Sequence, residues 1–512
     1  MIRFTRSLAA VLIVCAPICA AEKKDDPPES AAAAKAPKKG AEAKRDTPDP
    51  VSKTASVTID GETVSYTATA GSLDLKKSDG KENASIFHVS YVRNDVENPQ
   101  DRPVMFAFNG GPGSSAVWLH LGVLGPKIID LPGDGTQAPK PPVRLVDNPL
   151  SILDACDLVF IDPVSTGYSR AGKDVNASQF HGLNGDISSV GDFIRRWVSE
   201  NKRWASPKFL LGESYGGIRV AGLSEHLQTR YGMSLNGVVL LSSLLDFATL
   251  SAAPGNDLPY LSFLQSYTGT AHFHGKIKGD REALMKEAAD FAFGDYAAAL
   301  LKGSDLDPAS AQAIATKLES LTGVSAELWL RNDLRLDSSV FRKELLRDQN
   351  KVIGRFDGRV AWSSAYESAA QATYDPSYSL AYGAFATAML DYLSRDLGYP
   401  EDQPYEILTG KVRPWRWDSE NKIVNVGDRL ATAMRDNPNL KVLVMAGKTD
   451  LATPPQGITY SLRHLPGLPE PAHQNISTVW YDGGHMFYLN PPDLRKTRTD
   501  LLDFLRSCQD DG

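Results

Sequence analysis

Cysteine is scarce in this sequence, which contains 4 cysteines in 512 residues. Two of them lie in an apolar N-terminal segment that looks like a cleaved leader, which leaves Cys156 and Cys508 in the mature chain. The fold therefore cannot depend on a disulfide framework, and whether these two cysteines pair stays open. An excess of one charge is also missing, since the formal net charge is −7 with both signs mixed. That balance argues against nucleic acid as the main partner.

No apolar run near the N-terminus is long enough to anchor the chain in a membrane. The run from residue 8 to 18 follows Arg3 and Arg6, and small residues come directly after it. Such a run is too short to span a bilayer but is typical of a secretory signal peptide. We therefore expect cleavage near Ala20 or Ala21, no transmembrane anchor, and export to the periplasm or the medium.

Large apolar residues are almost absent between residues 22 and 55, where Lys, Ala, Asp, Glu and Pro dominate. Such a segment cannot bury enough surface to order itself, so it is predicted to be a disordered linker. The sequence as a whole is 42% hydrophobic, so the chain has ample material for a large core. The predicted organisation is a signal peptide (1–21), a linker (22–55), a first core part (56–247), a helical cap (248–417) and a second core part (418–512).

Short apolar runs alternate with helical periodicity in both predicted core parts. A hairpin is expected first, because Val57–Ile59 and Thr63–Tyr66 flank the turn residues Asp60-Gly61-Glu62. Further strands are expected at 86–92, 104–108, 158–161, 208–211, 238–241, 441–446 and 476–481. This alternation predicts an α/β fold with a mostly parallel sheet covered by helices on both faces. Between the two core parts, Ala-rich helical stretches such as 281–301 and 309–321 predict a helical insertion.

The sequence Gly212-Glu213-Ser214-Tyr215-Gly216 follows the strand at 208–211 and precedes a helical pattern. A G-x-S-x-G turn between a strand and a helix is typical of a nucleophile elbow, which holds a serine clear of the sheet. Alone this motif is weak, since it also occurs by chance. Its weight depends on what stands at the other strand ends.

Three further strands end in chemically suggestive residues. The strand at 104–108 runs into Asn109-Gly110-Gly111, the strand at 441–446 runs toward Asp450, and the strand at 476–481 runs toward His485. Functional groups of an open parallel sheet gather at these carboxyl ends. The order Ser214, Asp450, His485 is the order used by α/β-hydrolases.

Each residue type suits one step of acyl transfer. A serine hydroxyl needs a base to accept its proton, an imidazole titrates near neutrality, and a carboxylate orients that imidazole. The backbone amides of Tyr215 and Gly111 are candidates for the oxyanion hole. No step of this chemistry calls for a metal or a cofactor.

Structural interpretations compete with these roles. His485 could be a packed histidine, Asp450 a helix cap, and Asn109-Gly110-Gly111 only a tight turn. Asp162 also ends a strand and is the rival carboxylate, but it precedes Ser214 and so breaks the expected order. The combination of four strand ends favours catalysis.

At these motifs the chain resembles the serine carboxypeptidase family, over roughly residues 75 to 505 and with a diverged cap. The segments that carry the resemblance are FNGGPGSSAVWLHLGVLGP (108–126), LVFIDPVSTGYS (158–169), GESYGG (212–217), GKTDLATPP (447–455) and GGHMFYLNPPD (483–493). It implies an α/β-hydrolase fold with a helical cap, an exported member of bacterial type, and removal of C-terminal residues from peptides.

The resemblance also implies roles residue by residue. Ser214 would be the nucleophile, Asp450 the orienting carboxylate and His485 the base, with Gly111 and Tyr215 as oxyanion donors. Asn109, Gly110 and Glu213 would bind the terminal carboxylate of the substrate, Glu213 in its protonated form.

Three positions depart from the family pattern. Ser114 stands where the family usually has a cysteine, and Lys448 replaces the first acidic residue of its Gly-Asp-x-Asp segment. Val123 stands where a glutamate often pairs with the residue equivalent to Glu213, so the paired carboxylates are expected to be lost. An esterase or acyltransferase with the same triad is therefore an alternative, and a non-catalytic binding protein of the cell envelope is a minor one.

Overall fold

The structure is a computed structural model that describes residues 48–509. The predicted signal peptide (1–21) and most of the predicted linker lie outside the described residues. Within the described part, no helix combines the length and hydropathy needed to cross a membrane.

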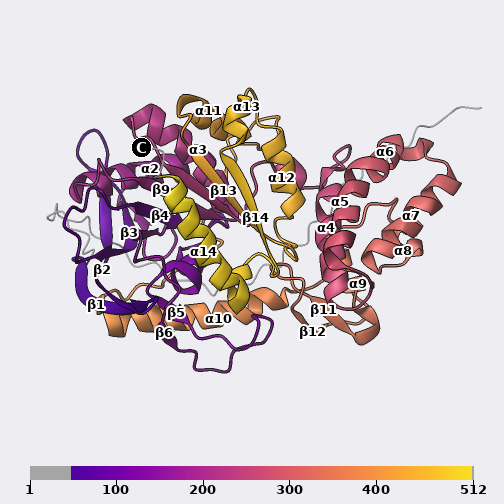
Figure 1. The fold of residues 1–512 in the computed structure, drawn as a ribbon, viewed down its shortest axis with the longest axis horizontal. Helices are drawn as coiled ribbons and strands as arrows, with labels where there is room; N and C mark the ends of the chain where they lie inside the picture. Colours follow the sequence, from indigo (N-terminus) through magenta and orange to yellow (C-terminus); the bar gives the residue numbers. More distant parts are fainter. Residues whose placement is uncertain (1–47, 510–512) are drawn as a thin grey trace, which may run out of the picture. The chain divides into compact units, whose positions relative to one another are not determined.

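A ten-stranded sheet organises the described chain (Figure 1). Its strand order is β1-β2-β3-β7-β4-β9-β10-β13-β14, and β8 pairs with β3. The six strands from β7 to β14 run parallel, whereas β1, β2 and β3 add an antiparallel edge. The strands are β1 (Val51–Ile59), β2 (Glu62–Lys76), β3 (Glu82–Arg93), β4 (Val104–Phe108), β7 (Asp157–Ile161), β8 (Arg170–Ala171), β9 (Lys208–Glu213), β10 (Gly237–Leu241), β13 (Lys441–Gly447) and β14 (Ile476–Tyr481).

The N-terminal hairpin is confirmed and is longer than the sequence predicted. Strand β1 pairs with β2 from Val51 onward, so residues 51–55 belong to the sheet and not to the linker. These residues are mostly polar and largely exposed, and ladder hydrogen bonds hold them in place. A composition-based boundary misses such a strand because it detects only apolar burial.

Side chains along the central strands alternate between two hydrophobic clusters, as the two-residue period of a strand requires. In β4, Met105 and Ala107 face one cluster, while Val104, Phe106 and Phe108 face the other. Helices α10 and α14 pack in the first cluster, and helices α2, α3 and α11 pack in the second. Helices therefore cover both faces of the sheet, and the prediction of an α/β-hydrolase fold with a mostly parallel sheet is correct.

Helices α5, α7 and α10 each begin after an aspartate whose side chain caps the helix. Helix α7 begins after Asp307, whose side chain accepts a hydrogen bond from the Ser310 amide, and ends at Gly323 in the left-handed region. Among the described residues, the α-helices of four or more residues are α2 (Leu183–Glu200), α3 (Tyr215–Tyr231), α4 (Leu258–Phe273), α5 (Arg281–Phe291), α6 (Ala297–Lys302), α7 (Pro308–Thr322), α8 (Ala326–Arg331), α9 (Ser338–Glu344), α10 (Pro376–Asp391), α11 (Gly427–Asp436), α12 (Pro455–Arg463), α13 (Glu470–His473) and α14 (Pro491–Ser507).

The segment predicted as one helical cap falls into two parts. Helices α4 to α9 build their own hydrophobic cluster, and residues 258–346 are called the helical lobe below. Helix α10 instead packs into the core cluster through Leu380, Phe385 and Met389. The hairpin of β11 (Lys351–Ile353) and β12 (Ala361–Ser363) separates the two parts. Periodicity alone cannot tell which cluster a buried helix joins.

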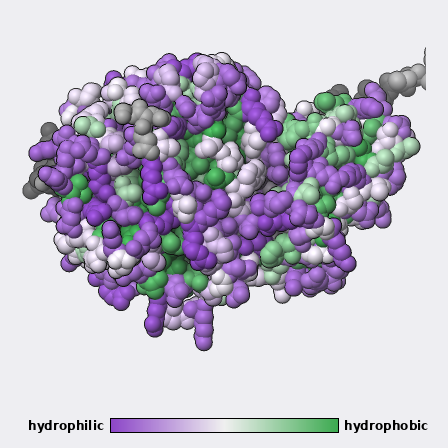
Figure 2. Space-filling view, viewed as in Figure 1, coloured by the Kyte–Doolittle hydropathy of each residue, from purple (hydrophilic) through white to green (hydrophobic). Residues whose placement is uncertain are grey.

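The visible face is mainly hydrophilic, with hydrophobic side chains also reaching the surface over the helical lobe (Figure 2). Among the large hydrophobic side chains of the described residues, Leu301 of α6 is the most exposed, with 85% of its surface accessible. Cys156 is a buried, free thiol. It therefore forms no disulfide with Cys508, which answers the question whether these two cysteines pair.

Candidate active site

The serine of the elbow sits in a backbone conformation that side chains rarely adopt. Strand β9 ends at Glu213, and Ser214 joins it to α3 with φ 63° and ψ −128°. The neighbouring glycines make this turn possible: a Cβ on Gly212 would lie 2.2 Å from the carbonyl oxygen of Gly216. The turn therefore places Ser214 at the N-terminus of a 17-residue helix, where the helix dipole favours negative charge.

Asp450 and His485 meet as a buried pair. The Asp450 Oδ2 atom lies 2.8 Å from His485 Nδ1, and the two side chains are 1% and 3% exposed. The other carboxylate oxygen of Asp450 accepts hydrogen bonds from the amides of Ala452 (2.7 Å) and Thr453 (2.9 Å). Both oxygens of this carboxylate are thus engaged, which fixes its orientation toward the imidazole.

This contact assigns the tautomer of His485. Because Nδ1 donates to a carboxylate, Nε2 is left as the atom that can accept a proton. Burial alone would lower the pKa of His485, but the carboxylates of Asp450 and Glu213 outweigh it and raise the pKa above its usual value. The Phe356 ring stacks on the imidazole, with centroids 5.1 Å apart, and holds the plane of the ring.

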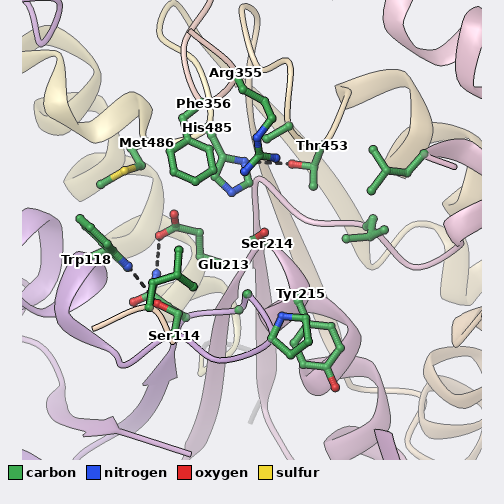
Figure 3. A pocket seen from close by; sticks show the side chains of 18 of the residues that line it. Ser114, Trp118, Glu213, Ser214, Tyr215, Arg355, Phe356, Thr453, His485 and Met486 are labelled. Carbon is green, nitrogen blue, oxygen red and sulfur yellow. Dashed lines mark hydrogen bonds between the residues drawn. The ribbon is translucent and has the colours of Figure 1, made fainter. Parts of the chain in front are cut away.

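Ser214 and His485 line the same cavity, and Figure 3 shows the serine below the imidazole and beside Glu213. No hydrogen bond joins Ser214 to His485 in the described chain. Such contacts are often long in the absence of substrate and tighten when it binds.

The loop after β4 lies directly against the elbow. A Cβ on Gly110 would be 2.4 Å from the Tyr215 amide nitrogen and 2.8 Å from the carbonyl oxygen of Glu213. Gly111 has φ 104°, a value that favours glycine. Gly111 and Tyr215 both border the cavity beside Ser214. The two predicted oxyanion donors therefore lie near each other, because Gly110, the residue before Gly111, packs against the amide of Tyr215.

Glu213 is buried next to the nucleophile, with 3% of its surface exposed. Its Oε2 atom accepts hydrogen bonds from Asn109 Nδ2 (2.8 Å) and from the Tyr488 hydroxyl (2.9 Å). Burial raises the pKa of Glu213 to about 7, although His485 and both hydrogen-bond donors act in the opposite direction. A carboxyl with this pKa is protonated under acidic conditions and can then donate a hydrogen bond.

The cavity has a volume of about 350 Å³ and extends beyond these groups. Its walls are formed by side chains from three further segments: Leu244, Phe247 and Leu250 after β10, Arg355 and Phe356 after β11, and Leu408, Thr409, Gly410 and Arg413 after α10. Within the described residues, no group of three or more His, Cys, Asp or Glu side chains is placed to hold a metal ion.

Several supporting residues were not predicted. Thr453 places its hydroxyl 2.8 Å from Asp450 Oδ2 and 3.0 Å from His485 Nδ1, so it braces the pair. Tyr488 fixes Glu213, as described above. Both lie in the segments that carry the family resemblance, within three residues of Asp450 and His485. Their closeness in sequence to Asp450 and His485 was the signal that could have identified them.

A buried ion pair beneath the elbow was also missed. Arg219 of α3 donates to Asp186 Oδ2 (2.9 Å) and to the carbonyl oxygen of Asn109 (2.6 Å), and the Tyr215 hydroxyl donates to the same Asp186 oxygen (3.1 Å). Arg219 therefore links the elbow helix α3 to the loop after β4. A charged residue inside the apolar pattern GGIRVAGL was the only hint of it.

The rival carboxylate, Asp162, lies elsewhere. It is buried, its Oδ1 atom accepts a hydrogen bond from the Ala116 amide (2.8 Å), and it does not border the cavity. Burial raises its pKa to about 7. Asp162 thus supports the chain that follows the glycine loop, and Asp450 is the carboxylate that contacts His485.

The three departures from the family pattern have distinct structural settings. Ser114 accepts a hydrogen bond from Trp118 Nε1 (2.9 Å) at the cavity wall. Val123 is packed in the hydrophobic core and does not border the cavity. Lys448 bonds to Glu282 of the helical lobe (2.7 Å) and to Asp482 (3.1 Å). Among the described residues, no second carboxylate hydrogen-bonds to Glu213.

Comparison with known proteins agrees with this arrangement. Residues 60–481 match the serine carboxypeptidase family over most of the chain. The chain belongs to the serine carboxypeptidase family.

Curated relatives match more locally. Serine carboxypeptidase-like 45 of Arabidopsis thaliana is 28% identical over 180 residues, which cover 33% of this chain and 36% of the relative. Serine carboxypeptidase-like 20 of the same plant is 30% identical over 142 residues, 27% of each chain. The matched segments thus span about a third of these relatives.

The fold is shared with the solved structure of a carboxypeptidase. Kex1(delta)p, a prohormone-processing carboxypeptidase from Saccharomyces cerevisiae, aligns with a TM-score of 0.52 at 15% identity, covering 86% of this chain and 91% of that one. At that identity the likeness concerns the α/β-hydrolase fold alone.

Proposed function

We propose that this protein removes C-terminal residues from peptides through an acyl-enzyme intermediate. The observation that carries the proposal is that His485, held 2.8 Å from the buried carboxylate of Asp450, lines one cavity with Ser214 and the protonatable Glu213. Family membership supports the same reaction class.

The mechanism assigns one role to each group. Ser214 Oγ attacks the carbonyl carbon of the last peptide bond while His485 Nε2 accepts the hydroxyl proton. The amides of Gly111 and Tyr215 stabilise the oxyanion. His485 then donates that proton to the leaving amine, the C–N bond breaks, and water hydrolyses the acyl-enzyme by the same route in reverse. Asp450 keeps Nδ1 protonated throughout.

Recognition of the terminal carboxylate is assigned to Asn109, Gly110 and Glu213. One N–H of the Asn109 side chain already donates to Glu213, so the carboxylate would be met by the second N–H and by the Glu213 proton. This role requires Glu213 to be neutral, which its raised pKa favours at acidic pH.

A fluorophosphonate probe tests the nucleophile. The wild-type protein is expected to be labelled, and Ser214→Ala is expected to lose all labelling. Persistent labelling of another serine would remove the assignment. A peptide and its C-terminally amidated twin then test exopeptidase specificity, because only the free carboxylate can use the Glu213 site. Equal cleavage of both would count against it.

The second candidate is an esterase or acyltransferase with the same three residues. The packed position of Val123 favours it, since Glu213 lacks the second carboxyl that often accompanies it in the family. Higher turnover of esters than of any peptide, with no effect of amidation, would support this candidate. A purified protein that is inert toward esters and peptides but retains a partner would favour the third, a binding role.

Export is proposed from the N-terminal residues alone. N-terminal sequencing of the protein from its natural source is expected to begin near Ala21 or Glu22. A mature chain that starts at Met1 would contradict it.

A further inference from the structure

The cavity beside Ser214 is lined by two arginines and, among the described residues that border it, by a single acid. The arginines are Arg355 and Arg413, and the acid is Glu213. Glu213 is occupied by Asn109 and Tyr488, and burial keeps it neutral below about pH 7. The net charge presented to a substrate under acidic conditions is therefore positive.

Arg355 is held in place with most of its hydrogen-bonding capacity unused. Its guanidinium lies over the Phe356 ring, 4.6 Å from the centroid, and Phe356 in turn stacks on His485. Its nearest carboxylate is Asp375, whose Oδ2 atom lies 3.9 Å from Arg355 Nε, beyond hydrogen-bonding distance. No other described residue accepts a hydrogen bond from this guanidinium. A cation–π contact thus orients Arg355 without satisfying its donors.

The backbone of Arg355 is held by Asp375 and by the segment that contains Asp450. Its amide donates to Asp375 Oδ1 (2.9 Å), and its carbonyl oxygen accepts from the Leu451 amide (3.1 Å), next to Asp450. In Figure 3 the side chain points into the cavity toward His485 and Thr453. The donors of Arg355 are therefore placed near the reacting groups, on a backbone that is anchored at both ends.

Arg413 adds a second positive charge at the cavity. Its side chain is exposed and forms no ion pair with the described residues. An unpaired arginine that borders a cavity is well suited to a carboxylate, because its planar donors match both carboxylate oxygens.

We propose that this cavity selects substrates with an acidic side chain next to the scissile bond, and that Arg355 is the main specificity-determining residue. The inference rests on the proposed function, in which Glu213 and Asn109 hold the terminal carboxylate. Because those residues use the first anion, the arginines are available for a second one. The substrate class is thus peptides with Glu or Asp at or directly before the C-terminus.

Two pairs of blocked peptides test this selectivity. One pair ends in Glu or Gln, and the other carries Glu or Gln at the penultimate position. The wild-type protein is expected to prefer Glu by about tenfold in kcat/KM in at least one pair, as a charged hydrogen bond replaces a neutral one. Raising the ionic strength should reduce this ratio. Ratios near one in both pairs would overturn the proposal.

Variants assign the preference to its residue. Arg355→Gln is expected to bring the Glu/Gln ratio close to one, Arg355→Lys to keep part of it, and Arg413→Gln to lower it by a smaller factor. Arg506→Gln, which removes an exposed arginine of α14, is the matched control and should leave the ratio unchanged. Because both substrates are compared within one preparation, a misfolded fraction cancels from the ratio. A ratio that neither Arg355→Gln nor Arg413→Gln alters would refute the assignment.

Failure of the proposed function has a different outcome. If no peptide is cleaved, the p-nitrophenyl esters of acyl-glutamate and acyl-glutamine report on the same cavity. Preference for the glutamate ester, lost in Arg355→Gln, would uphold the selectivity while refuting the peptidase. Equal hydrolysis of both esters would overturn the selectivity for an acid directly before the scissile bond, which is the position that these esters test.

Discussion

The strand ends and the cavity walls of this protein are built on different principles. The strand-end groups, from Asn109 to His485, stand on a parallel sheet whose backbone and glycine contacts leave little freedom. The walls come from loops at 244–250, 355–356 and 408–413, which connect the core to the lobe and to α10. We therefore assign the proposed reaction to the strand ends and the choice of substrate to the walls.

The electrostatics of the two regions differ in the same way. Carboxylates at the strand ends accept hydrogen bonds within the protein: Asp450 contacts His485 and two amides, and Glu213 accepts from Asn109 and Tyr488. The guanidinium of Arg355 in the wall has no such partners among the described residues. Under the proposed function, the protein therefore orients the carboxylates of the strand ends itself, whereas the arginine assigned to substrate choice keeps its donors for the substrate. The expected effects of substitutions should follow this division.

The largest contrast is expected between two buried aspartates. Asp450→Asn should lower kcat by about 10⁴, because the amide favours the wrong tautomer of His485. Asp162→Asn should change kcat by less than about threefold, since an amide oxygen can still accept the hydrogen bond of the Ala116 amide. Steady-state kinetics on an activated ester at several pH values measures both. Comparable losses in the two variants would show that Asp450 has no special role.

Two glycines of the cavity provide the next contrast. A Cβ on Gly110 would lie 2.4 Å from the Tyr215 nitrogen, whereas a Cβ on Gly410 would meet nothing within 4 Å. Gly110→Ala should therefore displace an oxyanion donor and reduce kcat by about 10²–10³. Gly410→Ala, the matched wall variant, should leave kcat on an activated ester nearly unaltered. Thermal unfolding of both variants separates this effect from misfolding, and a fully active Gly110→Ala would break the comparison.

The sequence predicts the strand ends better than it predicts the cavity walls and the packing of the helices. The sequence predicted the elbow and the strands that carry Ser214, Asp450 and His485, because each of these features is encoded in a few consecutive residues. Strand β1 was partly missed since its polar residues are held by backbone pairing. The split of the predicted cap was missed because α10 is apolar enough to fit either cluster.

The partners of the site were harder to predict than its members. Tyr488 reaches Glu213 across 275 positions of the chain, and Phe356 reaches His485 across more than a hundred. Such pairs depend on how loops fold back over the sheet, and no local pattern encodes them. Arg355 and Arg413 likewise could not be singled out from the sequence, because only the folded chain shows that both border the same cavity.

Glu213 predicts a pH dependence that separates peptides from esters. Its pKa is raised to about 7, so it is protonated below that value and becomes a carboxylate above it. As the pH rises through about 7, the KM for peptides should increase, because an anion at Glu213 repels the terminal carboxylate of the substrate. Titration of His485 affects peptides and esters alike, so the ratio of their kcat/KM values isolates Glu213.

Glu213→Gln is the matched variant, since the amide can donate a hydrogen bond at every pH. It should flatten the ratio and change peptide affinity by about tenfold or less. If the ratio in the variant still falls through neutral pH, a titratable group other than Glu213 controls peptide binding, and the proposed role of Glu213 would be refuted.

The smallest effect is expected where the lobe contacts the strand ends. Lys448, at the end of β13, bonds to Glu282 of α5 and to Asp482 after β14, and Arg281 of α5 also pairs with Asp482. Because Glu282 and Asp482 are more than half exposed, water screens this network, and Lys448→Met should cost about 1 kcal/mol or less. The loss of stability should shrink at high salt.

The matched control is Lys286→Met, which removes an exposed lysine from α5, the helix that carries Glu282. Thermal unfolding at low and high salt measures both variants. A Lys448→Met protein that keeps its full stability but loses activity would mean that this network positions Asp450 and His485, so that the lobe takes part in the chemistry and not only in the choice of substrate.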